Sequence, residues 1–266
     1  MTFELKNKGL IALDLDGTTV EGKNPPSKEV AKGLKSFSEE GWKIAFVTGR
    51  SLGWVKGLLK DLDFPYELAV QNGALGLSFP SGRQLFKNYL NTFAAEKAND
   101  IPLPYALYTG DEKDTVYWQP DRYSKIEREY LRSRIEAFQE NWIDDWILPK
   151  EAAAFKWFGK QHVMEELGLQ LVALGFQCTP IKDPFDASVT ICQATHPKAN
   201  KGEALRQLQN GVMGPTIAAG DDMNDFPLLQ AADIAIAMPK APEALRDLAH
   251  FIADRGLISA LKEATK

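Results

Sequence analysis

The stretch LIALDLDGT, residues 10–18, decides the fold of this chain. Four apolar residues run without a polar break into Asp14, and Asp16 follows two positions later. An unbroken apolar run of this length suits a strand that is buried on both faces, as in a parallel sheet. Such sheets bind ligands just beyond the carboxyl ends of their strands. The pattern therefore predicts a ligand site at Asp14, and the alternative is a strand that ends in an ordinary Asp-Gly turn.

Further apolar runs repeat this pattern and alternate with helical patterns. The runs cover residues 44–47, 68–70, 216–219 and 234–237, and helices are predicted over residues 28–40, 51–61, 242–249 and 256–264 and from residue 201 onwards. Ser27 is predicted to cap the first of these helices. Alternation of buried strands and helices predicts an α/β fold with a parallel sheet.

The pattern changes between residues 83 and 193. Four of the six tryptophans and six of the seven tyrosines lie there, and the runs are no longer purely apolar. Helices are predicted over 124–141 and 161–174, and strands over 104–109, 115–119, 154–158, 176–181 and 187–192. We therefore predict an α+β unit, residues 83–193, inserted into a core of residues 1–82 and 194–266.

The aromatic residues of the predicted insert leave two interpretations open. They can line a sugar pocket, or they can form the core of a small domain. Trp118 and Tyr123 flank a predicted loop, so they are the first candidates for exposed side chains that contact a substrate.

Composition limits the class of protein. A net charge of -5 over 266 residues argues against a nucleic-acid binder or a membrane-surface protein. No apolar run has transmembrane length, and the first residues do not resemble a signal peptide. The two cysteines, Cys178 and Cys192, are too few for a disulfide framework, and buried reduced thiols are the expectation. These features together predict a cytoplasmic location.

Residues that suit phosphoryl transfer follow three of the predicted strands. Asp14, Thr48 and Asp221 each come directly after or near the end of an apolar run, and the ends of parallel strands lie side by side. Lys201 adds a cation at the start of a helix. Carboxylates this close repel each other, so the set also requires a cation such as Mg²⁺.

These residues resemble the motifs of the haloacid dehalogenase-like (HAD) phosphatases. Asp14-Leu15-Asp16-Gly17-Thr18 is similar to the first motif, and Thr48, Lys201 and Asp221 match the other three in chain order. Asn72-Gly73-Ala74, residues 201–205 and residues 220–225 resemble the Cof-like type IIB subgroup in particular. The resemblance implies a Rossmann-like core with an inserted α+β cap that sets substrate specificity.

The resemblance also implies roles for individual residues. Asp14 would be the nucleophile and form an aspartyl-phosphate, and Asp16 would be the general acid and base. Mg²⁺ would be held by Asp14, Asp221 and the backbone carbonyl of Asp16, with Asp225 in the same metal site or touching the phosphate. The residues implied to contact the phosphate are Thr48, Gly49, Lys201 and Asn224. Lys201 is also implied as a catalytic residue that balances negative charge on Asp14.

The expected activity is Mg²⁺-dependent hydrolysis of a small phosphorylated metabolite, with a sugar phosphate as the first choice. A phosphomutase of the same superfamily and a non-catalytic sugar-phosphate-binding protein are the alternatives. We expect a monomer or small homo-oligomer without nucleic-acid or membrane partners. One departure from the subgroup is Met238-Pro239-Lys240-Ala241, where members commonly have Met-Gly-Asn-Ala, so a loop near the site is altered.

Overall fold

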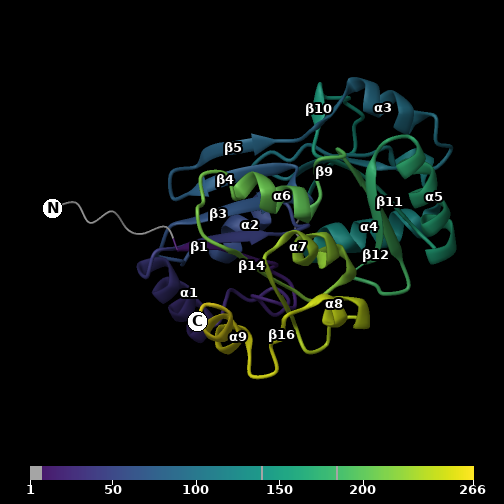
Figure 1. Cartoon of the computed structure of the whole chain (residues 1–266). Coiled ribbons are helices and arrows are strands. Elements are labelled where there is room, and N and C mark those ends of the chain that lie inside the picture. Colours follow the sequence, from purple (N-terminus) through teal and green to yellow (C-terminus); the bar gives the residue numbers. More distant parts are fainter. Residues whose placement is uncertain (1–7, 139, 184) are drawn as a thin grey trace. The chain divides into compact units, whose positions relative to one another are not determined.

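The structure is a computed structural model that describes residues 8–138, 140–183 and 185–266 (Figure 1). The chain divides into two compact units. Unit 1, here called the core, comprises the residues up to Arg50, Val55–Lys87 and Asn200–Lys266. Unit 2, here called the insert, comprises Ser51–Trp54 and Asn88–Ala199.

Residues 51–54 and 194–199 belong to the insert, although the prediction placed them in the core. Conversely, residues 83–87 belong to the core. These residues form strand β5 (Arg83–Lys87), which pairs antiparallel with β4 (Leu75–Phe79) in the core sheet. Neither strand is predicted by the sequence pattern. Both are only partly buried, so neither carries the unbroken apolar run that identifies the inner strands.

Within the described residues the core contains one eight-stranded sheet, in the order β16-β15-β14-β1-β2-β3-β4-β5. From β16 to β3 all neighbouring strands pair in parallel. The remaining bounds are β1 (Gly9–Leu13), β2 (Trp42–Val47), β3 (Tyr66–Val70), β14 (Thr216–Gly220), β15 (Ile234–Ala237) and β16 (Phe251–Ile252). This sheet confirms the predicted α/β class and its Rossmann-like core.

Strand β1 lies at the point where the strand order reverses. The chain runs outward from β1 through β2 and β3 on one side, and through β14, β15 and β16 on the other. In open parallel sheets such a switch point leaves a crevice at the carboxyl ends of the two central strands. The residues that follow β1 and β14 are therefore the ones that a ligand would meet.

Helices pack on both faces of the core sheet. Helices α1 (Lys28–Glu39) and α9 (Leu257–Ala264) contact each other and the sheet. The side chain of Ser27 accepts a hydrogen bond from the backbone N–H of Val30, which confirms the predicted cap. Helix α2 (Leu52–Leu59) follows β2 and also falls within its predicted range.

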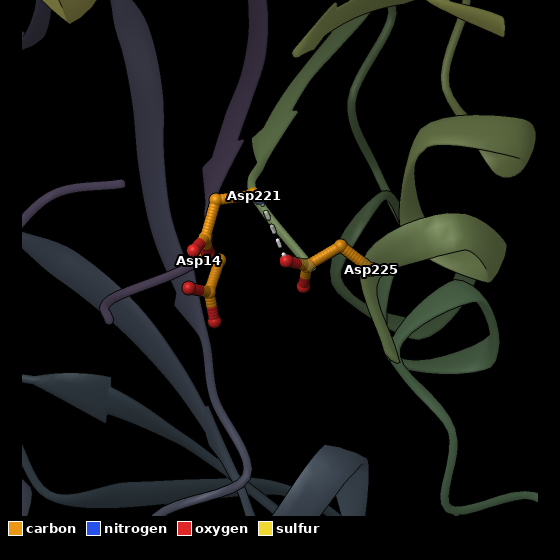
Figure 2. A group of neighbouring side chains, drawn as sticks. All are labelled: Asp14, Asp221 and Asp225. Atoms are coloured by element: carbon orange, nitrogen blue, oxygen red, sulfur yellow. Dashed lines mark hydrogen bonds between the residues drawn. The ribbon is translucent and has the colours of Figure 1, made fainter. Parts of the chain in front are cut away.

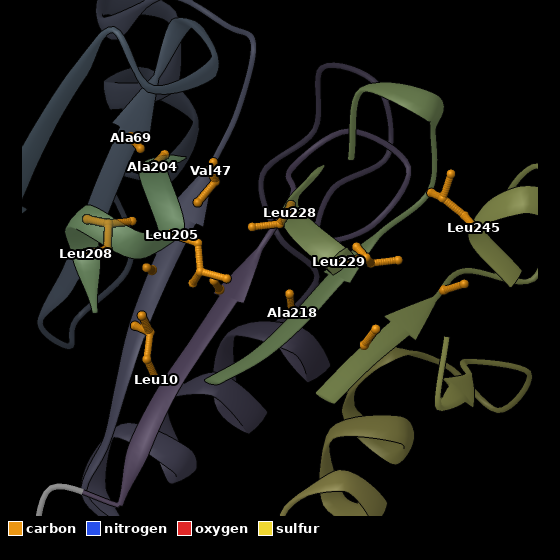
Figure 3. Packing of buried hydrophobic residues seen from close by; sticks show 14 of the residues in the cluster. Leu10, Val47, Ala69, Ala204, Leu205, Leu208, Ala218, Leu228, Leu229 and Leu245 are labelled. Atoms are coloured by element: carbon orange, nitrogen blue, oxygen red, sulfur yellow. The ribbon is translucent and has the colours of Figure 1, made fainter. Parts of the chain in front are cut away.

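The other face is covered by α6 (Lys201–Leu208), α7 (Phe226–Ala231) and α8 (Glu243–Leu248). Figure 3 shows leucines of these helices, among them Leu205 and Leu228, packed over small strand residues such as Ala218. Because the strands present small side chains here, the helices lie close to the sheet. This packing holds the start of α6 and of α7 near the ends of the central strands.

The insert has a six-stranded sheet of its own among the described residues, in the order β12-β13-β11-β7-β8-β9. A short pair, β6 (Leu90–Asn91) and β10 (Glu151–Ala152), accompanies it. The bounds are α3 (Thr92–Asn99), β7 (Ala106–Tyr108), β8 (Thr115–Tyr117), α4 (Lys125–Phe138), β9 (Asn141–Ile143), β11 (Ala154–Gly159), α5 (Gln161–Ala173), β12 (Gln177–Lys182) and β13 (Thr190–Thr195). Residue 139, within the predicted helix over 124–141, lies outside the described residues.

The predicted strand over 187–192 is shifted to Thr190–Thr195 in the structure. Asp186 accepts hydrogen bonds from the backbone N–H groups of Ser188 and Val189, through its side chain and its carbonyl respectively. A turn therefore occupies the first residues of the predicted strand. An aspartate that bonds the backbone two residues later is a common way to form such a turn.

Trp118 and Tyr123 are core residues of the insert, so the prediction that they are exposed substrate contacts is wrong. Their side chains are 0% and 4% exposed, and their ring centroids lie 5.4 Å apart. The indole N–H of Trp118 donates to Asp144 (2.8 Å). The predicted loop between them forms a single helical turn, η2 (Pro120–Arg122), which lets both rings pack in one cluster.

Cys178 and Cys192 lie on the neighbouring strands β12 and β13 as free thiols, with their Sγ atoms 3.0 Å apart. Cys192 is buried and Cys178 is half-buried. Across the described part of the chain, no helix is long and apolar enough to cross a membrane.

Candidate active site

Three aspartates of the core converge at the switch point of the sheet. Asp14 directly follows β1, Asp221 directly follows β14, and Asp225 ends the one-turn helix η3 (Met223–Asp225). Carboxylate oxygens of all three lie within 4.8 Å of one another. Figure 2 shows the carboxylates of Asp14 and Asp221 next to each other, with that of Asp225 facing them. The sheet thus joins residues that are far apart in the sequence.

Lys201 bridges two of these aspartates. Its Nζ lies 2.6 Å from Oδ1 of Asp14 and 2.5 Å from Oδ1 of Asp225. The lysine is 2% exposed and is the first residue of α6, whose N-terminus is capped by the side chain of Asn200. The buried ammonium is paired with both carboxylates. Charged groups are tolerated in a protein interior when they are paired in this way.

Asp225 uses both of its carboxylate oxygens within the protein. Oδ1 accepts from Lys201, and Oδ2 accepts from the backbone N–H groups of Asp221 (3.0 Å) and Asp222 (3.2 Å). The residue is completely buried. We therefore expect Asp225 to orient Lys201 and the Asp221 loop, besides its predicted place beside the metal.

The electrostatics of the group are dominated by burial and by mutual repulsion. Burial, together with the charges of Asp225 and Asp221, raises the pKa of Asp14 well above its usual range, although Lys201 opposes the shift. Burial and Asp225 raise the pKa of Asp221 to about 6. Burial alone would lower the pKa of Lys201, but the charges of Asp14 and Asp225 outweigh it and raise that pKa.

The residues present fit a divalent cation. Three carboxylates face one ammonium, so the ionised group carries an excess negative charge in a largely buried place. Oxygen ligands of this kind suit hard cations such as Mg²⁺. The raised pKa values of Asp14 and Asp221 indicate that Lys201 alone does not neutralise the group. Asp14, Asp221 and Asp225 are the residues that could hold such an ion.

The loop after Asp14 approaches Asp221 very closely. A Cβ atom on Gly17 would lie 2.1 Å from Oδ2 of Asp221, and Gly17 has a φ of +74°, a conformation that favours glycine. The hydroxyl of Thr18 donates to Oδ1 of Asp221 (3.4 Å). Gly17 and Thr18 of the first motif therefore help to position Asp221, which belongs to the fourth motif.

The side chain of Asp16 does not join the three aspartates but pairs with Arg50. Nε of Arg50 donates to Oδ2 of Asp16 (2.5 Å), and Nη2 of Arg50 donates to Oδ1. The Asp16 side chain is 44% exposed. The predicted metal contact of Asp16 through its backbone carbonyl stays a prediction. Arg50 follows Thr48 by two positions, and the sequence favoured a structural role for it instead of a place in the site.

The predicted phosphate-contacting residues lie on segments around this group. Thr48 directly follows β2 and is 1% exposed, and its Oγ1 accepts from the backbone N–H of Arg50 (3.1 Å), which leaves the hydroxyl hydrogen to donate. Asn224 is half-buried in η3, beside Asp225. Their contacts with a phosphate, and that of Gly49, stay predictions.

The loop that departs from the subgroup pattern begins beside the end of β14. The backbone N–H of Met238 donates to the carbonyl of Gly220 (3.0 Å), and that of Ala241 donates to the carbonyl of Met238. Pro239 and Lys240 thus occupy a turn next to the strand that carries Asp221.

Ligands of open parallel sheets bind at such a switch point, and a carboxylate there can act as a nucleophile. A sequence model of the haloacid dehalogenase-like hydrolases matches residues 11–256, and the chain belongs to that family.

Several proteins named as phosphatases are similar to this chain over nearly its whole length. Phosphatase YwpJ of Bacillus subtilis is 27% identical, over 91% of this chain and 93% of its own. The 5-amino-6-(5-phospho-D-ribitylamino)uracil phosphatase YwtE of the same organism is 26% identical, over 91% of each chain.

Solved structures share the fold. The SMU.1108c protein of Streptococcus mutans has a TM-score of 0.77 at 16% identity, over 96% of this chain and 98% of its own. The HAD subclass IIB sugar phosphatase BT4131 has a TM-score of 0.69 at 18% identity, over 97% of this chain and 98% of its own. The type IIB fold anticipated from the motifs is thus the fold of this chain.

Proposed function

We propose that this HAD phosphatase uses Mg²⁺ and an aspartyl-phosphate intermediate to hydrolyse a small phosphorylated metabolite, most specifically a sugar phosphate. The observation that carries the proposal is the position of Asp14. It lies at the switch point of the sheet, bonded to Lys201 and within reach of Asp221 and Asp225. Carboxyl groups whose pKa is strongly raised by burial and by neighbouring charges are concentrated at functional sites.

In the first step Asp14 attacks phosphorus, and a bond forms between its carboxylate oxygen and the phosphoryl group while the ester bond to the leaving oxygen breaks. Only the ionised carboxylate is a nucleophile. Lys201 favours that form by its charge and its hydrogen bond to Oδ1. A bound Mg²⁺ would add charge stabilisation, with Asp14, Asp221 and Asp225 as the residues that hold it.

Asp16 is the proton donor and acceptor in this proposal. In the first step the protonated Asp16 gives its proton to the departing alkoxide. In the second step the ionised Asp16 removes a proton from the water that cleaves the aspartyl-phosphate. Its half-exposed side chain, held by Arg50, is two residues from the nucleophile. Thr48 would donate its hydroxyl hydrogen to a phosphate oxygen, where negative charge is greatest in the transition state.

The substrate class is supported by the relatives and not by any residue of the insert. YwtE is named for a phosphorylated ribityl compound, and BT4131 for sugar phosphates. We propose that the insert sets the choice among such compounds. We also propose that the protein acts in the cytoplasm.

The test is phosphate release from a panel of phosphorylated sugars, polyols and nucleotides, with Mg²⁺ or with EDTA. We expect Mg²⁺-dependent release that Asp14→Asn lowers at least about 1,000-fold, because an amide is a poor nucleophile and metal ligand. The control Asp63→Asn changes an exposed aspartate whose side chain forms an ion pair with Lys35. Lasting formation of an isomerised sugar phosphate without free phosphate would contradict the proposal and favour a mutase.

A further inference from the structure

The two cysteines of the chain face each other on neighbouring strands of the insert. Cys178 lies on β12 and Cys192 on β13, and their Sγ atoms are 3.0 Å apart. In the antiparallel register Cys178 pairs with Ala194, and Cys192 pairs with Pro180. The cysteines therefore occupy diagonal positions on one face of the sheet. The chain contains no other cysteine.

The two thiols differ in how a reagent can reach them. Cys192 is 0% exposed and lies under α5, where a Cβ on Gly168 would be 3.8 Å from its Sγ. Cys178 is half-buried and lies on an edge strand, because β12 pairs only with β13 among the described strands. A reagent in solution therefore meets Cys178 first.

Cys192 holds its proton more firmly than an ordinary cysteine. The hydrogen bond with Cys178, burial and the negative charge of an ionised Cys178 all raise the pKa of Cys192. A thiolate, and not a thiol, attacks a disulfide. Cys178 is therefore the first thiol to react, and Cys192 is a second thiol placed within hydrogen-bond distance of it.

We infer that Cys178 and Cys192 form a redox modification site, a dithiol that a small-molecule disulfide such as oxidised glutathione converts into an intramolecular disulfide bond. This site goes beyond the proposed function and does not depend on it. The chemistry is thiol–disulfide exchange, in which two protein thiols are oxidised and one small disulfide is reduced to two thiols.

The exchange proceeds in two steps. The Cys178 thiolate attacks one sulfur of oxidised glutathione, the S–S bond of the reagent breaks, and one glutathione thiolate leaves and takes up a proton. Cys192 then loses its proton, attacks the Cys178 sulfur and displaces the second glutathione. The position of Cys192, 3.0 Å from the sulfur that it attacks, offsets its low tendency to ionise.

The strand positions indicate that the bond is reversible. Residues at diagonal positions of an antiparallel pair are farther apart than residues directly opposite each other. A disulfide between them draws the two strands together, and strained disulfides are more readily reduced. The bond joins the edge strand β12 to β13 and closes a loop between residues 14 positions apart.

The test exposes the folded, full-length protein to glutathione buffers with an increasing oxidised fraction and then stops the exchange with acid. Intact mass spectrometry and thiol titration identify the product. We expect a monomer that has lost two hydrogens and both thiols, and that regains them in reduced glutathione. Cys178→Ser should lose its remaining thiol at least about tenfold more slowly than the wild type, because Cys192 is buried. Cys192→Ser should stop at a mixed disulfide with glutathione.

The urea-unfolded wild type is the control for the reagent, since both of its thiols are accessible. Retention of both thiols by the folded protein, in a buffer that oxidises the unfolded one, would overturn the inference. A product that carries glutathione without an internal disulfide, or a disulfide-linked dimer, would overturn it as well. Equally fast thiol loss in Cys178→Ser and the wild type would contradict the first attack by Cys178.

Discussion

Arg50 joins the predicted acid and base to the predicted phosphate loop. Its guanidinium binds both carboxylate oxygens of Asp16, and its backbone N–H donates to Oγ1 of Thr48. Two parallel N–H···O bonds from a planar guanidinium fix the orientation of a carboxylate as well as its position. A half-exposed aspartate would otherwise be free to rotate. Arg50 is thus a positioning residue for Asp16.

We predict that Arg50→Lys lowers turnover selectively. Lysine keeps the charge but cannot form the two-pronged contact, so Asp16 should protonate a departing oxygen less effectively. Turnover of a sugar phosphate should fall by about tenfold or more, and turnover of a nitrophenyl phosphate by much less, because a nitrophenolate barely needs a proton. Steady-state kinetics on both substrates provide the measurement.

Comparison with Asp16→Asn tests whether Arg50 acts through Asp16. If Arg50 acts through Asp16, the double variant should be no worse than Asp16→Asn alone, as residues that work as a unit are not additive. Arg255→Lys, at an exposed ion pair with Glu263, is the matched control. Equal losses of turnover on both substrates in Arg50→Lys would contradict a role of Arg50 in proton transfer by Asp16.

Lys201→Met is predicted to destabilise the metal-free protein by an amount that grows with pH. Burial already raises the pKa of Asp14, and loss of the opposing ammonium raises it further. The folded carboxyl then holds its proton at pH values where the unfolded one has lost it. The unfolded state binds fewer protons, so stability falls as pH rises.

We expect a loss of unfolding free energy that is small at pH 5 and reaches about 3–5 kcal/mol at pH 8, as for other broken buried ion pairs. Urea unfolding in EDTA at the two pH values measures it. Lys198→Met is the control, since Lys198 is exposed and only three positions away. A loss of the same size at both pH values would contradict the electrostatic explanation.

Gly17→Ala should impair metal binding, whereas Gly22→Ala should not. Both glycines have positive φ, +74° and +60°, so each alanine carries a similar backbone cost of about 1–2 kcal/mol. Only the Cβ at residue 17 collides with Asp221, and nothing lies within 4 Å of one at residue 22. Mg²⁺ should raise the Tm of the wild type and of Gly22→Ala.

For Gly17→Ala we expect Mg²⁺ affinity lower by about 10- to 100-fold, the usual effect of displacing a support of a metal ligand. Thermal unfolding at increasing Mg²⁺ concentration gives the affinity without an activity assay. Similar Mg²⁺-induced shifts in the two variants would show that Asp221 tolerates displacement or does not hold the ion.

Trp118→Ala should lower stability and both activities together. The ring is completely buried, and its N–H bonds Asp144, so truncation should cost about 3–5 kcal/mol. Calorimetry, with assays on a sugar phosphate and an aryl phosphate, measures the outcome. Leu169→Ala, at a leucine that is 75% exposed in the same unit, is the control. A selective loss of sugar phosphate turnover at an unchanged Tm would restore Trp118 as a substrate contact.

Much of the core could be predicted because its signals are local. Unbroken apolar runs identify β1, β2, β3, β14 and β15, and Ser27 identifies the start of α1. Strands β4 and β5 were missed because both lie at the antiparallel end of the sheet, are only partly buried and carry no such run. The start of β13 was misplaced because an aspartate turn interrupts residues that look extended.

The positions of the carboxylates after the two central strands, and of a lysine at the start of a nearby helix, can be read from the sequence alone. The pairing of the charges cannot: Lys201 pairs with Asp14, 187 positions away, and Arg50 pairs with Asp16. Only the tertiary structure decided that Trp118 is core and that Cys178 and Cys192 face each other. The physical reason is that secondary structure follows from neighbouring residues, whereas burial and electrostatic partners depend on distances that exist only once the sheet has formed.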